Sequence, residues 1–107
     1  MIVYEVNVAV RREIESEYRQ WLDAHVREIV ALPGFLGAQV FERREPAAAD
    51  GEFALCMQYR LRDAAAFADY LREHAPRLRA DGIARFGDRF RAERRVLEFA
   101  SEYGAPG

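Results

Sequence analysis

The chain has 107 residues, a formal net charge of −2, a hydrophobic fraction of 50% and a charged fraction of 32%. This length suits one domain with one hydrophobic core, and the composition is that of a globular rather than a disordered protein. The small net charge, without any block of like charges, gives no electrostatic reason to expect a nucleic acid or an anionic membrane as a partner.

Arginine supplies all sixteen basic residues, and the sequence has no lysine and no threonine. We interpret this as a genome-wide compositional bias, so an arginine cluster carries little functional weight. The cluster from Arg85 to Arg95 looks like a basic patch, but Asp88 and Glu93 interrupt it. Nucleic-acid binding is therefore not expected from it.

Cys56 is the only cysteine, so no internal disulfide can form, and a reducing cytoplasm fits this usage. The N-terminal residues 1–8 lack a basic region ahead of an apolar stretch, which argues against a signal peptide. No segment approaches the roughly 18 apolar residues of a membrane span. The sequence thus predicts a cytoplasmic protein with no membrane partner.

Residues 2–10 predict a strand, because β-branched side chains alternate there with others. One face carries Ile2, Tyr4, Val6, Val8 and Val10, and the other has Glu5 and Asn7 at its centre. Residues 12–32 predict a helix whose apolar stripe follows the i, i+3, i+4 spacing. The stripe consists of Ile14, Tyr18, Trp21, Leu22, His25, Val26, Ile29 and Leu32. Pro33 and Gly34 then end the helix.

Two strands and a hairpin loop are expected next. Residues 35–44 predict the second strand, residues 45–51 have the composition of a turn, and residues 52–61 predict the third strand. The third strand is the clearest, since its large apolar side chains alternate strictly with smaller or polar ones. The large ones are Phe53, Leu55, Met57, Tyr59 and Leu61.

Asp63 is a good N-cap for a second helix. Its expected apolar stripe is Phe67, Ala68, Leu71 and His74. Pro76 either ends this helix or opens a second helical turn through Leu78 to Asp81, which Gly82 would break. Further apolar anchors are expected at Ile83, Phe86 and Phe90.

Residues 89–100 predict the fourth strand, and residues 101–107 predict a flexible tail after a single domain over residues 1–100. The order βαββαβ predicts an α+β, ferredoxin-like fold, in which one four-stranded antiparallel sheet has both helices on one face. The other face would carry Val3, Glu5, Asn7, Gln39, Phe41, Cys56, Gln58 and Arg60. This mixture is too apolar to be fully solvated, so we expect a second copy to cover it in a homodimer.

Several motifs resemble a family of small bacterial proteins known only as a domain of unknown function. They are residues 70–78 (YLREHAPRL), Phe86-Gly87, residues 95–98 (RVLE), and the N-terminal MIVYEVNV; Trp21-Leu22 with His25, and Gln58-Tyr59, also match. That family resembles the dimeric α+β barrel group, which includes antibiotic-biosynthesis-type monooxygenases, chlorite-dismutase-like haem proteins and stress-responsive barrel proteins. The resemblance implies a fold and a dimer but not a reaction.

The two histidines suggest a ligand site. His25 and His74 lie on the predicted inward stripes of different helices, so their imidazoles would approach one another beside Tyr4, Trp21 and Tyr59. These five residues would form an aromatic pocket with titratable groups, which predicts a site for a small-molecule ligand. The alternative, which such histidines more often represent, is a pair of partly buried structural side chains.

No cofactor is expected. A metal site needs three or four ligands, and the third is missing, since Cys56 has the parity of the opposite sheet face. One histidine can bind haem iron, but no recognisable haem pocket accompanies it. Polar residues on the dimer-facing side, such as Glu5 and Gln58, would either line a cavity or fix the dimer register, and we favour the second.

The functional hypothesis is a small dimeric barrel protein of unknown activity that binds a small ligand, if it has one. The alternatives are a cofactor-independent monooxygenase-like enzyme and a purely structural module. The oxygenases of the barrel group use a tryptophan, an asparagine and a histidine or arginine. Trp21, Asn7 and His25 have those types, but the parity of Asn7 places it on the face away from the helices.

Overall fold

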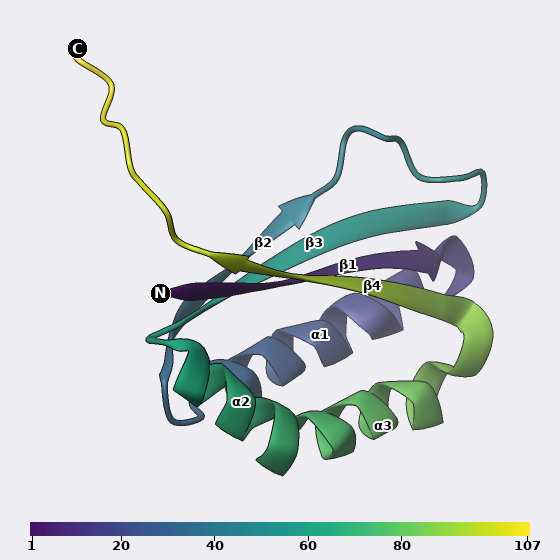
Figure 1. The fold of residues 1–107 in the computed structure, drawn as a ribbon. Coiled ribbons are helices and arrows are strands. Elements are labelled where there is room, and N and C mark those ends of the chain that lie inside the picture. The colour runs from purple at the N-terminus through teal and green to yellow at the C-terminus, as the bar shows by residue number, and fades with distance from the viewer.

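A computed structural model describes residues 1–107 as one antiparallel sheet with all helices packed on one face (Figure 1). The sheet order is β2-β3-β1-β4, which is the ferredoxin-like arrangement, so the predicted fold is confirmed. The elements are β1 (Ile2–Arg11), η1 (Arg12–Ile14), α1 (Glu15–Val30), β2 (Phe35–Glu42), β3 (Glu52–Leu61), α2 (Ala64–Glu73), α3 (Ala75–Phe86), η2 (Gly87–Arg89) and β4 (Phe90–Glu98).

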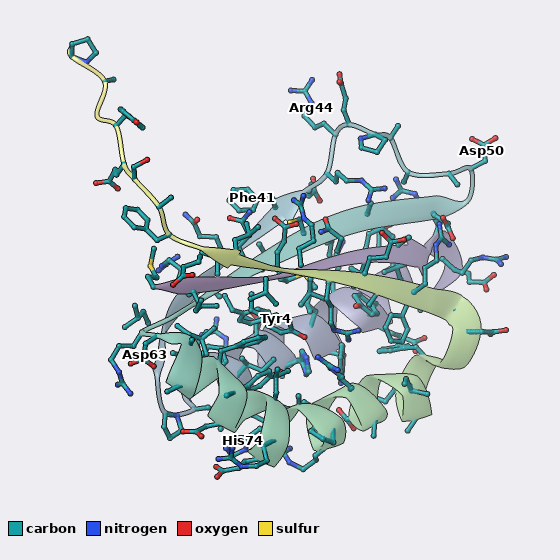
Figure 2. All side chains as sticks on the ribbon, in the orientation of Figure 1. Tyr4, Phe41, Arg44, Asp50, Asp63 and His74 are labelled. Carbon is teal, nitrogen blue, oxygen red and sulfur yellow. The ribbon has the colours of Figure 1, made fainter.

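The register of β1 fixes which side chains face the helices. Tyr4 lies opposite Tyr59 on β3, and Glu5 lies opposite Gln58 on β3 and Arg95 on β4. Because neighbouring residues of a strand point to opposite faces, Tyr4 points to the helices and Glu5 to the open face. Figure 2 shows Tyr4 between the sheet and the helices and Phe41 on the opposite face.

The strands at both sheet edges are shorter than predicted. β2 ends at Glu42 instead of residue 44, and β4 spans Phe90–Glu98 instead of residues 89–100. Residues 99–107 form no helix or strand and extend away from the sheet (Figure 1). The alternation of side chains does not define the end residues of a strand well, because pairing with the neighbouring strand decides where a strand ends.

The first helix is as predicted except at its ends. Its first turn is the 3-10 helix η1, and α1 itself ends at Val30, two residues before Leu32. Its predicted stripe does face the sheet, where Tyr18, Leu22 and Ile29 are buried. Gly34 (φ +86°) then turns the chain into β2 and packs against Ala66 of α2.

The stripe predicted for α2 was partly wrong. Asp63 does cap the helix, since its Oδ1 accepts a hydrogen bond from the Ala66 amide at 2.8 Å. The buried residues are Ala66 and Tyr70, while Ala68 and Leu71 are exposed. Tyr70 points toward the sheet and packs against the rings of Tyr4 and Phe35. Its ring centroid lies 5.8 Å from that of Tyr4 and 5.2 Å from that of Phe35.

The predicted break at Gly82 was wrong. A full helix, α3, begins at Ala75 with Pro76 in its first turn, and it continues through Gly82 to Phe86. Gly82 is buried because α3 passes so close to α1 that an added Cβ would lie 3.2 Å from Trp21 Cη2. Ile83, expected as an apolar anchor, is 61% exposed, whereas Phe86 is buried and Phe90 packs on the core.

The core is rich in aromatic side chains. Tyr18 on α1 is 1% exposed and contacts four aromatic rings from α1, β3, α3 and β4. These rings are Trp21, Phe53, Phe86 and Phe90. Tilted and edge-on pairs of this kind stabilise a core beyond the area that they bury. None of the three α-helices is both long and apolar enough to cross a membrane.

Candidate functional site

A cavity of about 50 Å³ lies between the helices and the covered face of the sheet. Its walls come from β1, β3 and β4 and from all three α-helices, and thirteen of its seventeen lining residues are hydrophobic. Protein cores contain few voids larger than a water molecule, and a void of this size holds a few waters. The cavity is therefore an unusual feature of the core.

Four tyrosines line the cavity and come from four different elements. They are Tyr4 on β1, Tyr18 on α1, Tyr59 on β3 and Tyr70 on α2. Only the Tyr4 hydroxyl has a hydrogen-bond partner in the chain, the Nη2 of Arg79 at 3.0 Å. Burial raises the pKa of Tyr70 to about 12 and also raises the pKa values of Tyr18 and Tyr59. The hydroxyls of Tyr18, Tyr59 and Tyr70 are thus neutral donors at physiological pH.

The charged residues of the cavity wall are both arginines. Arg79 reaches it from α3 and Arg94 from β4, and no carboxylate lines it. The Nε of Arg79 is buried without a hydrogen-bond partner, and it is the one buried side-chain nitrogen or oxygen atom of the chain in that state. A buried donor left unpaired costs about 1–3 kcal/mol.

Trp21 and His25 form the wall contributed by the middle of α1. Their rings stack with centroids 4.3 Å apart, and the Trp21 indole nitrogen donates to Asp81 of α3 at 2.9 Å. A second contact joins the same helices, since Arg77 on α3 pairs with Glu28 on α1 at 3.0 Å. Burial lowers the pKa of His25 below its ordinary value, which favours the neutral imidazole.

Four of the five predicted pocket residues line the cavity. Tyr4, Trp21, His25 and Tyr59 are among its walls, and His74 is not. His74 lies at the junction of α2 and α3, on the side of the helix layer away from the sheet (Figure 2). The two imidazoles were expected to approach each other because His74 was assigned to the inward stripe of the second helix. In the structure the inward residue of that turn is Tyr70.

Sequence reasoning missed four polar residues of the site, which are Tyr18, Tyr70, Arg79 and Arg94. Tyr18 was placed on the inward stripe of the first helix but was not linked to the pocket. Tyr70 was hidden by the misplaced stripe of the second helix. Arg79 follows Leu78 in a helix expected to break at Gly82, and Arg94 lies in a cluster attributed to composition. A polar residue at an inward-facing position was the available signal for Arg94, which lies opposite Val6.

The open face of the sheet has a polar centre of a different kind. Glu5 is buried there and accepts hydrogen bonds from Asn7 at 2.9 Å, Gln58 at 3.0 Å and Arg95 at 2.7 Å. Burial raises the pKa of Glu5, but these three hydrogen bonds outweigh that effect and hold it below its ordinary value. Asn7 thus lies on this face, away from Trp21 and His25, as its parity predicted.

A surface pocket of about 770 Å³ covers this polar centre, and Cys56 lines it together with the loop after β2. Burial raises the pKa of Cys56, so its thiol is protonated and a poor nucleophile. No group of three or more His, Cys, Asp or Glu side chains in the chain is placed to hold a metal ion.

Comparison with known proteins gives a family and a fold. Residues 1–100 match the family model described as domain of unknown function DUF4286, and no curated protein matches. A Deinococcus radiodurans structure, provisionally assigned as an antibiotic biosynthesis monooxygenase, superposes with a TM-score of 0.76 at 14% identity and covers 100% of both chains.

Two other solved structures are similar. HapK from Hahella chejuensis has a TM-score of 0.69 at 15% identity and covers 100% of both chains. SnoaB from Streptomyces nogalater, a cofactor-independent oxygenase, has a TM-score of 0.62 at 16% identity, covering 99% of this chain and 98% of its own. At these identities the similarity shows the fold alone, and it confirms the predicted resemblance to the antibiotic-biosynthesis-monooxygenase group.

Proposed function

The chain belongs to the DUF4286 family, and we propose that it binds a small molecule in the cavity between its helices and sheet, as a homodimer. The cavity itself carries this proposal. In a core without a ligand function, filling such a void with hydrocarbon would raise the stability of the fold. A buried donor without a partner lowers that stability. This core keeps both a void and the unpaired Nε of Arg79.

The size of the cavity limits the ligand. At about 50 Å³ it is far smaller than the roughly 300–1,000 Å³ of sites for drug-sized molecules. A ligand of a few heavy atoms fits as the walls stand. A larger one needs α3 to move away from α1, which breaks the contacts of Trp21 with Asp81 and of Arg77 with Glu28.

The single tryptophan provides a direct test, since Trp21 lines the cavity and its fluorescence responds to a ligand bound there. Phenol is larger than the cavity as the walls stand, so its binding requires α3 to move away from α1, and we expect it to quench Trp21 saturably. Ala92→Leu adds carbon atoms to the cavity wall on β4 and should abolish the effect, whereas Ala84→Leu on the exposed face of α3 should leave it intact. Equal quenching of both variants would contradict the proposal.

The homodimer rests on the open sheet face. Exposed apolar side chains, Phe41 on β2 and Leu97 on β4, flank the polar centre around Glu5. A second sheet packed on this face would remove these apolar groups from water and cover the surface pocket. The fold shared with the similar structures supports this arrangement.

Light scattering coupled to size exclusion tests this arrangement. The wild type should elute at twice the 12.3 kDa monomer mass. Phe41→Glu should shift the mass to that of the monomer, because it adds a charge to the proposed interface. Leu71→Glu, at a similarly exposed apolar position on α2, should remain dimeric. A monomeric wild type at micromolar concentration would refute the dimer.

A second candidate function is cofactor-independent oxygenation of a phenolic compound. His25 favours it, because a neutral imidazole in an aromatic wall can accept a phenol proton. Against it stands Asn7, which donates to Glu5 on the other face. Oxygen uptake with a panel of phenols, lost in His25→Gln and kept in His74→Gln, would support this candidate over simple binding.

A further inference from the structure

The cavity wall has positive charges and hydrogen-bond donors but few acceptors and no negative charge. The wall holds two guanidinium groups and four phenol hydroxyls but no carboxylate. The imidazole of His25 is the only strong acceptor among its ring and charged groups. A ligand that satisfies this wall must therefore offer acceptors and negative charge.

Neither arginine of the wall forms an ion pair. Arg77 pairs with Glu28 and Arg91 pairs with Glu52, whereas Arg79 and Arg94 have no carboxylate within 4.0 Å. Both guanidiniums act on the cavity hydroxyls, because each opposes the effect of burial on the pKa of Tyr70. Neither guanidinium is thus neutralised by an ion pair, and the nearby carboxylates of Glu28 and Asp81 act on His25 from outside the wall.

The contacts of Arg79 leave one of its buried donors without an acceptor. Its Nη2 donates to the Tyr4 hydroxyl at 3.0 Å, and its Nε, on the same edge of the guanidinium, has no partner. Since Tyr4 accepts this bond, its own hydroxyl proton remains free to donate. A planar carboxylate has two oxygens, so it can accept from the Nε with one and from the Tyr4 hydroxyl with the other.

We propose that the ligand of this cavity is a small monocarboxylate whose carboxylate contacts Arg79 and Tyr4 and whose apolar remainder faces the aromatic wall. This inference rests on the proposed function and narrows it to one chemical class. A carboxylate fits better than a phosphate, because a monocarboxylate presents an apolar side to the aliphatic and aromatic carbons of the wall, whereas a phosphate carries oxygens on every side. Arg94 contributes charge from the β4 side.

Acid and amide pairs of equal shape test this class in the wild-type protein. Propionate is compared with propionamide, and benzoate with benzamide, by the quenching of Trp21 at pH 7; the larger pair requires α3 to move away from α1. We expect each acid to bind at least about tenfold more tightly than its amide, since a charge-assisted bidentate bond is replaced by a neutral one. The preference should weaken as the chloride concentration rises.

Variants then assign the residue. Arg79→Met keeps the length of the side chain and removes its charge, and it should lose the preference for the acid. Arg72→Met, on the exposed side of α2, should keep it. Circular dichroism checks that both variants are folded, and the wild-type acid and amide comparison stands even if Arg79→Met is not.

The outcomes separate the two levels of proposal. Amides that quench Trp21 as strongly as the acids would overturn the carboxylate inference and leave small-molecule binding in place. An acid preference that survives in Arg79→Met would also overturn it. If none of the four probes and no phenol changes the fluorescence of Trp21, small-molecule binding in this cavity and the carboxylate inference both fail.

Discussion

The two faces of the sheet bury polar groups in opposite ways. On the open face, Glu5 accepts three hydrogen bonds and pairs with Arg95. On the covered face, Arg79 has the one buried side-chain nitrogen without a partner, and the hydroxyls of Tyr18, Tyr59 and Tyr70 line the cavity without a partner in the chain. A satisfied network stabilises an arrangement, whereas unsatisfied donors in a void indicate room for another molecule. Residue type alone does not separate the two cases.

The largest expected effect is on packing at the covered face. Tyr18→Ala should lower the free energy of unfolding by about 3–5 kcal/mol, because it removes a buried ring with four aromatic neighbours. Phe41→Ala, on the open face and 44% exposed, should cost less than about 1 kcal/mol within one protomer. Denaturant unfolding measures both.

The protein concentration sharpens this contrast. If two copies pair through the open face, the midpoint for the wild type rises with concentration, and Phe41→Ala reduces that dependence. If Tyr18→Ala and Phe41→Ala lowered the free energy of unfolding equally, at a concentration that keeps the protein monomeric, the proposed difference between the two faces would be contradicted.

The next effect concerns the satisfied network. Glu5→Gln keeps the shape of the side chain but removes the charge that Arg95 contacts and one of the acceptors. We expect a loss of about 1–3 kcal/mol in the free energy of unfolding at pH 7. Since the pKa of Glu5 is lowered on folding, the wild type should lose this advantage as the pH falls through the folded-state pKa, so the two proteins converge in acid. Parallel pH profiles would rule out this role.

A smaller effect involves His25. Burial lowers its pKa in the folded state, so below the unfolded-state pKa of about 6.5 the unfolded chain binds a proton that the folded one does not. Stability should therefore fall as the pH drops from about 6.5 to the folded-state pKa and then level off. His25→Gln should remove this part of the profile, and His74→Gln is the control that should retain it. Thermal unfolding from pH 7.5 to 5 measures the difference.

The smallest effect is expected for an unpaired hydroxyl. Tyr59→Phe removes an oxygen that has no hydrogen-bond partner in the chain, so the free energy of unfolding should change by less than about 0.5 kcal/mol. A loss of more than 1 kcal/mol, on the order expected for a paired hydroxyl, would show that the donors of the covered face are satisfied after all.

Most of the architecture followed from local patterns. The alternation in residues 52–61 gave the bounds of β3, and Asp63 marked the start of α2. The parity of β1 placed Tyr4 and Glu5 on the correct faces. The errors lie where short helices meet: α2 is only ten residues long, and one wrong position rotates its inward stripe from Tyr70 to Leu71.

The site was predicted less completely, since its polar members are not neighbours in sequence. Tyr4 and Arg79 are 75 positions apart and meet through one hydrogen bond. His74 was included in the pocket on the basis of helical spacing, and the start of α3 places it outside the cavity wall. Arginine is so frequent in this chain that the two arginines of the cavity could not be distinguished by composition.

The sequence by itself determined the order of the elements, the strand faces and the wall formed by Tyr4, Trp21, His25 and Tyr59, because periodicity and parity are local properties. The tertiary structure alone decided that Gly82 belongs inside a helix. It also decided that Arg79 reaches Tyr4 and that a void remains between them and the aromatic rings. These features depend on how closely α3 approaches α1 and the sheet, and such distances are set by packing between elements rather than by the pattern within any one of them.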